Sequence, residues 1–494
     1  MTKAAVFDEN GREIGFARRP NEMQFPGPGH TERDPDRMWK AACESVTEVL
    51  EATATKPSDV AAVSVSGYGG GLYVVDKNGD PVRPGIVSTD SRTIPLLAEL
   101  RASGALAKVS AQVQQHDWPG QSAMLMAWLA RNEPEMSAAA ASITFCKDFI
   151  RRRLTGDHTT DPTDAGLGGL MDVTTSRYAN QVYDDLGMAV WRGKVPPIAP
   201  TIGIAGHITA AAARLTGLAE GTPVSRGIVD VAASTIASGI VDSTEISTVA
   251  GTFSVNNTLH KTPKLDTLPF YQMPYPVRGQ FLAGEASATS ASNFEWLLRN
   301  LLCADGIVRP AGERSLYDMC SDLISSRLNA PNDIQFMPFL FGGPEGAPAG
   351  LLGVQARHKT GDVLRAVFEG VAFSHKTDIG ILLSGPDAAR PKTARLGGGA
   401  SKNMVWAQIF ADTLGMPVEI TDGTELGAQG CAITAAAAAG LHPDIETAIA
   451  RMVRVVRRFE PNAERTAVLH KKYQKFRDIT KALAAAWQPS ASAA

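Results

Sequence analysis

Asp230 is the residue of this chain whose type and setting most directly suggest chemistry. It follows the segment 225–229, which is predicted to be a strand and ends with the apolar pair Ile228-Val229, and the small residues 232–234 come soon after it. A carboxylate at the end of a buried strand can point into a crevice. There it can accept the proton of a substrate hydroxyl while that oxygen attacks a phosphoryl group. The alternative is a structural role, in which Asp230 caps the helix that follows.

Two glycine-rich segments in the second half of the chain are suited to approach a phosphate or a nucleotide. Gly251 and Thr252 lie between two predicted strands, 246–250 and 254–259, so backbone N–H groups and the Thr252 hydroxyl can come close to a phosphate. A turn that only reverses the chain is the alternative. Farther along, the glycines 397–399 end another predicted strand ahead of a helix, which leaves bare backbone for a flat ligand near a helix N-terminus.

The elements that must position these groups are those of an α/β protein with a mixed sheet. A hairpin is predicted at the N-terminus, with strands at 3–7 and 12–18 around a turn of polar residues and glycine. A helix is expected to begin at Pro35 with Asp34 as its N-cap. A further strand is predicted at 60–65, where β-branched and small residues dominate.

The length of the chain predicts two domains. Its 494 residues exceed what a single core usually holds. A second series of strands and helices, similar in order to the first, begins near residue 241, although no residue-level repeat is visible. We therefore predict domains at 1–241 and 242–494, with a duplicated architecture.

A longer pattern lies at 349–369. Its spacing is small-x-aliphatic-x-Gly-aliphatic, seven residues, Asp-aliphatic, two residues, Ala-Val-Phe-Glu. This resembles the second signature of the FGGY carbohydrate kinases, and the residues that fit it are Ala349, Leu351, Gly353, Val354, Asp362, Val363, Ala366, Val367, Phe368 and Glu369. The resemblance covers nearly the whole chain and is nearest to L-xylulose and erythritol kinases.

The resemblance implies a fold and an activity. The fold is α/β, with two actin-like, ribonuclease H-like ATPase domains and a cleft between them. The activity is ATP-dependent phosphorylation of a small sugar or polyol, such as L- or D-xylulose, a tetritol or a pentitol, with Asp230 as general base. ATP and Mg²⁺ are the implied cofactors, without an identified metal ligand. The residues that match the nucleotide side are Gly251, Thr252, Gly398, Gly399 and Asn403.

The sugar side matches the family less closely. The loop 66–71 lies where family members carry sugar-contacting side chains, but Tyr68 and Gly70 stand here in place of a glutamine and a polar residue. Those contacts therefore do not transfer to this chain. The sugar is expected on the N-terminal domain, and the sequence leaves its identity open among the tetritols and the pentuloses.

Two other candidates for the sugar side come from the resemblance. Asp90 and Arg92 match a D-x-R element of five-carbon sugar kinases, in which Asp90 can accept hydrogen bonds from sugar hydroxyls and Arg92 can be its ion-pair partner. A surface turn is the alternative. Trp118 falls in the region of the first family signature, where its ring can stack on a sugar face or belong to the core.

The N-terminus begins at the tail of the family's first motif. Family members open with a strand that carries D-x-G-[TS], followed a few residues later by K-A-x-x-F-D, whereas this sequence starts with the residues of the latter, 1–8. The simplest expectation is a start codon assigned too late, at an internal methionine. The alternative is a truncated, non-catalytic protein that binds a sugar or a nucleotide.

The composition of the chain excludes some classes of function. The formal charge is −3, with no basic stripe, which argues against nucleic-acid binding. The five cysteines are scattered and no apolar run reaches about 18 residues, so we expect a cytoplasmic protein without a membrane partner. A homodimer is only a family-level expectation. A nucleotide-dependent dehydrogenase is disfavoured, because the glycines at 397–399 lack the G-x-G-x-x-G spacing and context.

Overall fold

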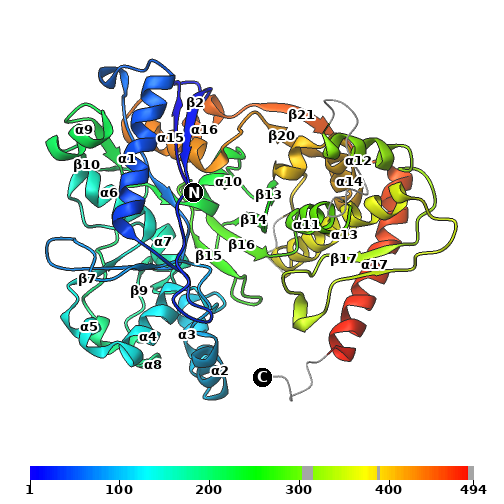
Figure 1. Ribbon diagram of the computed structural model, residues 1–494, viewed down its shortest axis with the longest axis horizontal. Coiled ribbons are helices and arrows are strands. Elements are labelled where there is room, and N and C mark those ends of the chain that lie inside the picture. Colours follow the sequence, from blue (N-terminus) through cyan, green and yellow to red (C-terminus); the bar gives the residue numbers. More distant parts are fainter. Residues whose placement is uncertain (303–314, 386–389, 488–494) are drawn as a thin grey trace. The chain divides into compact units, whose positions relative to one another are not determined.

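The computed structural model describes residues 1–302, 315–385 and 390–487 (Figure 1). The chain forms two compact units, each built from separate segments. The first contains Met1–Asp242, Leu259–Ala283 and Gly423–Arg454, and the second contains Ser243–Thr258, Gly284–Asp422 and Val455–Ala494. The domain boundary at 241/242 stays a prediction, but two later segments of the chain belong to the first unit.

The first unit opens with the predicted hairpin and helix. Strands β1 (Thr2–Phe7) and β2 (Glu13–Arg19) pair antiparallel in a two-stranded sheet. In the turn between them, Asp8 Oδ1 accepts the N–H groups of Asn10 and Arg12, each at 2.9 Å. The hairpin prediction is confirmed. The predicted cap of α1 is also confirmed, because Asp34 accepts from the backbone N–H groups of Asp36 and Arg37. Figure 1 shows α15 (Leu426–Ala438), from late in the chain, beside this hairpin.

The elements of the first unit are numerous and short. Its strands are β1 (Thr2–Phe7), β2 (Glu13–Arg19), β3 (Glu32–Arg33), β4 (Ser66–Gly67), β5 (Tyr73–Val75), β6 (Gly85–Ile86), β7 (Ser142–Thr144), β8 (Met171–Asp172), β9 (Arg177–Tyr178), β10 (Ile204–His207), β11 (Pro223–Ser225), β12 (Ile228–Val229) and β15 (Tyr271–Pro274). Its helices are α1 (Pro35–Ala52), α2 (Ile94–Ala102), α3 (Ala105–Val113), α4 (Ser122–Asn132), α5 (Pro134–Ala139), α6 (Cys146–Thr155), α7 (Pro162–Leu167), α8 (Val182–Asp185), α9 (Ala210–Thr216), α10 (Asp230–Ala237), α15 (Leu426–Ala438) and α16 (Ile445–Met452).

The strand predicted at 60–65 is wrong in its position. Regular pairing is confined to β4, which runs parallel to β12, and residue 63 makes only an isolated bridge. The reason lies in the segment that pairs with these residues, where Gly227 has φ +80°. The Gly227 backbone lies so close to the Val65 carbonyl oxygen that a Cβ added to Gly227 would overlap this oxygen. This kink divides β11 from β12 and interrupts the ladder.

The large sheet of the chain has the strand order β15-β16-β14-β13-β19-β20-β21. Pairing is antiparallel for β13 with β14 and for β20 with β21, and parallel for β13 with β19 and β19 with β20, so the sheet is mixed as predicted. The strands from β13 onward, β15 excepted, are β13 (Glu245–Ala250), β14 (Ser254–His260), β16 (Phe281–Ser287), β17 (Gln335–Met337), β18 (Gly350–Leu352), β19 (Thr393–Gly398), β20 (Val418–Thr421) and β21 (Val455–Phe459).

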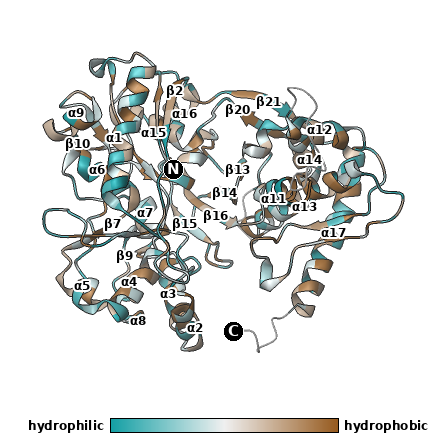
Figure 2. Ribbon diagram, viewed as in Figure 1, coloured by the Kyte–Doolittle hydropathy of each residue, from teal (hydrophilic) through white to brown (hydrophobic). Residues whose placement is uncertain are grey.

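A hydrophobic core covers this sheet in the second unit. The helices here are α11 (Ser292–Leu297), α12 (Leu316–Ser325), α13 (Thr360–Leu382), α14 (Met404–Leu414) and α17 (Ala463–Ala486). The Phe368 ring of α13 stacks on Trp406 of α14, with centroids 3.9 Å apart. Hydrophilic and hydrophobic residues alternate along α17 (Figure 2). Within the described ranges, no helix combines the length and the apolar composition that a membrane span needs.

Candidate active site

Asp230 lies where two parallel strands end together. Val229 of β12 pairs with Gly67 of β4, so the residues that follow the two strands emerge at the same edge. Asp230 is the first residue of α10, and Val229 occupies the N-cap position, so Asp230 does not cap the helix. Its Oδ1 accepts the N–H of Val231 at 2.7 Å, and the nearby backbone N–H of Gly69 also favours the ionised form of the carboxylate. The carboxylate is thus held beside the loop that follows β4.

The environment of Asp230 suits a proton acceptor. Burial raises the pKa of its carboxyl from 3.8 to about 6, although hydrogen bonds from the backbone at Val231 and Gly69 act in the opposite direction. A general base works best when its pKa lies near the pH of the reaction. The group can therefore be ionised at neutral pH and still hold a proton well enough to remove one from a hydroxyl.

Trp118 lies directly over the glycines of the β4 loop. A Cβ added to Gly70, which has φ +73°, would lie 2.6 Å from Trp118 Cζ2 and 2.8 Å from the Gly120 carbonyl oxygen. The indole also meets Phe270, with ring centroids 5.9 Å apart and planes tilted by 39°. Trp118 and Phe270 are both half-buried. Sequence reasoning did not identify Phe270, because it lies far from the other candidates along the chain.

The Asp90 carboxylate is buried and hydrogen-bonded by other residues of the protein. It is 1% exposed, so the surface-turn alternative is wrong. Arg92 donates to both carboxylate oxygens at 2.9 Å, and the N–H of Thr31 donates to Oδ2 at 2.6 Å. Arg92 also pairs with Glu32 at 2.7 Å. These bonds are those of a structural ion-pair network, and a contact of Asp90 with a sugar stays a prediction.

A buried cluster of charges underlies the same loops. Lys147 Nζ lies 2.6 Å from Asp148, 3.1 Å from Asp161 and 3.0 Å from Asp164, with all four side chains at most 1% exposed. A Cβ added to Gly67 would lie 2.7 Å from the Lys147 backbone nitrogen, so the cluster is adjacent to β4. Burial raises the pKa of Asp164 to about 8. Sequence reasoning missed this cluster because its members give no compact motif.

In the second unit, the two predicted phosphate and nucleotide segments lie in contact. Gly251 opens the turn from β13 to β14, and β13 runs parallel to β19 with Ala250 opposite Gly398. A Cβ on Gly398 would lie 3.0 Å from the Gly251 nitrogen. Thr252 is exposed. The turn therefore offers a hydroxyl and backbone N–H groups beside a glycine-lined strand end, which fits phosphate oxygens.

The other two candidates for nucleotide binding, Gly399 and Asn403, differ in exposure and in their hydrogen bonds. Gly399 is exposed, whereas Asn403 is the N-cap of α14 and accepts the N–H groups of Val405 and Trp406, both at 3.1 Å. The Asn403 amide also donates to Ser321 Oγ at 2.6 Å. Asn403 thus orients the first turn of α14, and direct contact with a nucleotide stays a prediction.

A network of buried polar side chains lies next to the turn between β13 and β14, and the sequence did not reveal it. Ser254 Oγ lies 3.0 Å from His375 Nδ1 and donates to Asp378 Oδ2 at 3.1 Å. His375 Nδ1 also lies 2.9 Å from Asn256 Oδ1, and its Nε2 lies 3.1 Å from Ser290 Oγ. Burial lowers the pKa of His375 to about 3, so the ring is neutral. Polar residues at alternate positions of β14 are the sequence signal that could have revealed this network.

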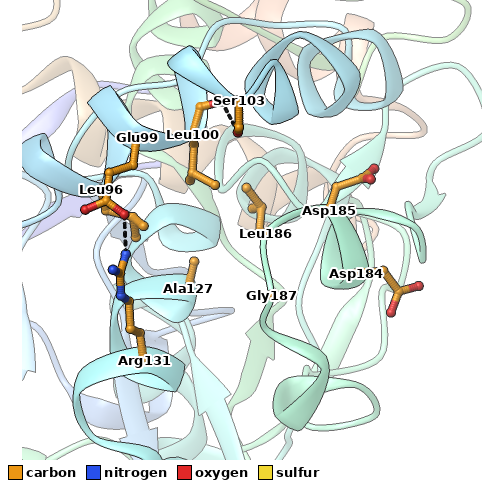
Figure 3. Close-up of a pocket in the computed structure, with 10 residues that line it drawn as sticks. All are labelled: Leu96, Glu99, Leu100, Ser103, Ala127, Arg131, Asp184, Asp185, Leu186 and Gly187. Carbon is orange, nitrogen blue, oxygen red and sulfur yellow. Dashed lines mark hydrogen bonds and ion pairs between the residues drawn. The ribbon is translucent and has the colours of Figure 1, made fainter.

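A surface hollow elsewhere in the first unit contains none of the candidate residues. Residues of α2, α4, α8 and the segment after α8 line it, and the Glu99–Arg131 ion pair, 2.6 Å long, lies on its wall (Figure 3). Among the described residues, no three histidine, cysteine or acidic side chains converge as a protein-held metal site would require. Magnesium is commonly held by one or two carboxylates together with substrate phosphates, so this finding assigns no ligand to it.

Comparison with known proteins identifies the chain. The model of the N-terminal domain of the FGGY family of carbohydrate kinases matches residues 1–237, and that of the C-terminal domain matches residues 246–439. The L-xylulose/3-keto-L-gulonate kinase of Escherichia coli is 30% identical over 484 residues, covering 97% of this chain and 95% of that protein. A probable L-xylulose kinase of Pasteurella multocida is 30% identical over 486 residues, covering 98% and 97%.

The structural comparison agrees with the sequence comparison. The crystal structure of the xylulose kinase from Rhodospirillum rubrum aligns with a TM-score of 0.86 at 26% identity, covering 97% of this chain and 96% of that one. The predicted fold class, with two actin-like ATPase domains, is confirmed by this likeness and by the two family models. The phosphate donor of the family is ATP. The chain belongs to the FGGY family of carbohydrate kinases.

Proposed function

We propose that this enzyme phosphorylates a small keto-sugar or polyol, such as L- or D-xylulose, a tetritol or a pentitol, with Asp230 as general base. The observation that carries the proposal is the buried Asp230 carboxylate at the end of β12, which accepts the N–H of Val231 and whose pKa is raised to about 6. The L-xylulose kinases among the relatives support a pentulose as the first substrate to test.

The reaction assigns a defined step to Asp230. Its carboxylate accepts the proton of the sugar hydroxyl as that oxygen forms a bond to the terminal phosphorus of ATP. The bond from this phosphorus to its bridging oxygen breaks, and ADP leaves. General-base catalysis contributes roughly 10²–10⁴-fold to such reactions.

The second unit supplies the nucleotide side of the proposal. Backbone N–H groups at Gly251 and the Thr252 hydroxyl bind phosphate oxygens, while Gly398 and Gly399 leave room for the nucleoside. Asn403 orients the adjoining turn of α14. Magnesium bound to the nucleotide would neutralise the charge of its phosphates.

An assay of ADP release with Mg-ATP, across three- to six-carbon ketoses and polyols, tests the proposal. We expect turnover with one sugar and loss of at least about 100-fold in kcat for Asp230→Asn. A matched control is Asp184→Asn, which changes an exposed carboxylate paired with Arg192 and should leave turnover unchanged.

Two outcomes would contradict the proposal. Full turnover by folded Asp230→Asn would remove Asp230 from the chemistry. Sugar binding by calorimetry without ADP formation, for every sugar tested, would favour a non-catalytic binding protein instead.

A further inference from the structure

We propose that a buried cluster of charged side chains beside β12 positions Asp230, and that Thr163 is the positioning residue through which the cluster acts. We call this cluster the β12 clamp, and its charged members are Lys147, Asp148, Arg151, Asp161 and Asp164. The inference rests on the proposed function, because it names what holds the proposed base in place. It goes further by giving a role to buried ionisable groups that the proposed reaction does not use.

The strand that leads to Asp230 is short and has few bonds of its own. Strands β12 and β4 form a two-stranded sheet in which each strand has two residues. Val229, which precedes Asp230, is the N-cap of α10, and its side chain cannot accept a hydrogen bond from the helix. Because a two-residue ladder fixes so little backbone, the position of Asp230 depends on bonds from outside the strand.

The clamp holds the end of β12 that leads into Asp230. Thr163 Oγ1 accepts the N–H of Val229 at 3.1 Å and donates to Asp161 Oδ2 at 2.7 Å. A backbone N–H can only donate and a carboxylate can only accept, so these two partners fix the direction of the hydroxyl. Thr163 and Asp161 are fully buried, so water does not compete for either bond. The backbone one residue before Asp230 is therefore tied to Asp161.

Asp161 is itself fixed by several partners. Lys147 Nζ lies 3.1 Å from Asp161 Oδ1, and Thr201 Oγ1 donates to Asp161 Oδ2 at 2.8 Å. Burial raises the pKa of Asp161, but the Lys147 charge and the hydroxyls of Thr163 and Thr201 outweigh it, so this pKa lies below its usual 3.8. Asp161 therefore stays ionised at neutral pH, and Thr163 keeps the same acceptor.

The clamp also holds the other end of β12. Arg151 Nη1 donates to the carbonyl of Arg226, two residues before the strand, at 2.7 Å. The same nitrogen donates to Asp148 Oδ1 at 2.6 Å, and Lys147 Nζ lies 2.6 Å from Asp148 Oδ1. A continuous series of ion pairs and hydrogen bonds thus joins the backbone before β12 to the backbone of Val229 at its end.

The burial of these charges argues for a role beyond stability. All five charged side chains of the β12 clamp are at most 1% exposed. Buried ion pairs often add little net stability, because removing charges from water costs about as much free energy as their attraction provides. What such a cluster does provide is one defined geometry, and here that geometry includes the strand before Asp230.

The first experiment removes only the hydroxyl of Thr163. Thr163→Val keeps the shape of the side chain but loses both hydrogen bonds. We expect kcat to fall about 10- to 100-fold while the sugar KM stays within about twofold, because a displaced base acts less well in the transition state. Thr163→Ser retains the hydroxyl and should restore kcat to within about threefold of the parent. If Thr163→Val does not fold, Thr163→Ala, which leaves room for a water at the Val229 N–H, takes its place with the same criterion.

The matched control is Thr216→Val. Thr216 is 1% exposed, and its Oγ1 donates to the Ala212 carbonyl at 2.8 Å and accepts the N–H of Leu218 at 3.3 Å. The control loses the same kinds of bonds, so we expect a similar fall in melting temperature with unchanged kcat. If Thr163→Val lowers the melting temperature as the control does and keeps the kcat of the parent, Thr163 serves stability alone and the proposal is overturned.

A double-mutant cycle tests whether Thr163 acts through Asp230. In the Asp230→Asn background, Thr163→Val should lower the residual kcat by less than about twofold, because the base that it positions is already gone. An equal loss of kcat in the two backgrounds would overturn the proposal.

Titration of the Asp230 carboxyl separates this inference from the proposed function, because it requires no turnover. The carboxyl resonance is followed by carbon-13 NMR and assigned by its loss in Asp230→Asn. We expect Thr163→Val to raise its titration midpoint by about half a pH unit or more, because a displaced carboxylate loses hydrogen bonds from the backbone.

The titration and the turnover of Asp230→Asn together decide between the two proposals. If Asp230→Asn keeps full turnover but the midpoint shifts in Thr163→Val, the proposed function fails and this inference stands. If Asp230→Asn loses turnover but Thr163→Val changes neither kcat nor the midpoint, this inference fails alone. If Asp230→Asn keeps full turnover and the midpoint does not move, both fail.

Discussion

At Asp230, burial opposes the charge that the reaction needs. The carboxyl is removed from water, which raises its pKa from 3.8 to about 6, while two backbone N–H groups stabilise the ionised form. The Asp230 carboxylate is therefore a base of useful strength, but it also destabilises the folded state when it is ionised. This conflict is typical of a functional residue, since a structural carboxylate is usually paired with a cation.

The pH dependence of kcat/KM should report this group. The base is ionised above its pKa, so we expect the rate to fall with unit slope below a pH of about 6 and to reach about a tenth of its plateau near pH 5. The measurement is kcat/KM for the sugar, taken from rates at varied sugar concentration and saturating Mg-ATP between pH 5 and pH 8. The residual rate of Asp230→Asn, which has no titrating carboxylate, should lack this acidic limb.

The contribution of Asp230 to the free energy of unfolding should fall as the pH rises, whereas the rate rises with pH. The raised folded-state pKa means that the destabilisation is absent below about pH 4, grows between pH 4 and 6, and is constant above that range. Urea denaturation should therefore show Asp230→Asn to be as stable as the parent at pH 4 and more stable at pH 8, by up to about 3 kcal/mol. A less stable variant at pH 8 would show that the carboxylate is held by partners that outweigh its burial.

At the scale of elements, one helix pair places this carboxylate. Helix α10, which begins with Asp230, packs against α15, which comes from a distant part of the chain. A Cβ on Gly430 of α15 would lie 2.7 Å from Ala233 Cα and would overlap the Ala233 carbonyl oxygen. Gly427, on the same helix, has nothing within 4 Å of an added Cβ. Both glycines lie on α15, but only Gly430 is needed for the close packing of α15 against α10.

Alanine at these two positions should have opposite effects. Gly430→Ala should lower the free energy of unfolding by about 1–3 kcal/mol, because α10 and α15 must separate, and should also reduce kcat by displacing Asp230. Gly427→Ala should raise that free energy by up to about 1 kcal/mol, since alanine is the better helix former. Chemical denaturation and the sugar-kinase assay measure both effects. Equal destabilisation by the two variants would contradict the packing described for α15.

At the scale of the whole molecule, the first compact unit does not follow the chain. Residues 259–283 and 423–454 complete it, and in the latter segment Glu425 pairs with Lys3 at 2.6 Å and Gln429 Nε2 donates to the Met452 carbonyl at 3.1 Å. A protein cut at residue 242 would therefore expose the face of α10 that α15 covers. The first compact unit therefore differs from the domain 1–241 predicted from the sequence, because it includes later segments of the chain.

A fragment of residues 1–242 should not unfold cooperatively on its own. We expect a broad urea transition and binding of a hydrophobic dye, because α15 and α16 are missing from its core. The control is the same fragment with residues 259–283 and 423–454 joined by flexible linkers, which should restore a sharp transition. A sharp transition for the shorter fragment would show that the first unit is independent of those helices.

The sequence was sufficient where local physics decides the outcome. The hairpin of β1 and β2, the Asp34 cap and the β13–β14 turn were predicted, because turn residues, caps and alternating strands act over a few positions. In the same way, the signature ending at Glu369 was enough to identify the family. Asp230 is a candidate because it follows a strand and because the family resemblance implies a general base at this position; its role stays a prediction.

Only the tertiary structure decided the features that depend on contacts between distant segments. Asp90 is a buried ion-pair residue because Thr31 and Arg92 enclose it. The exclusion of a side chain at Gly70 depends on an indole some 50 residues away in the chain, at Trp118. Side chains that meet only after folding leave no pattern along the sequence, because close packing is a property of the folded interior.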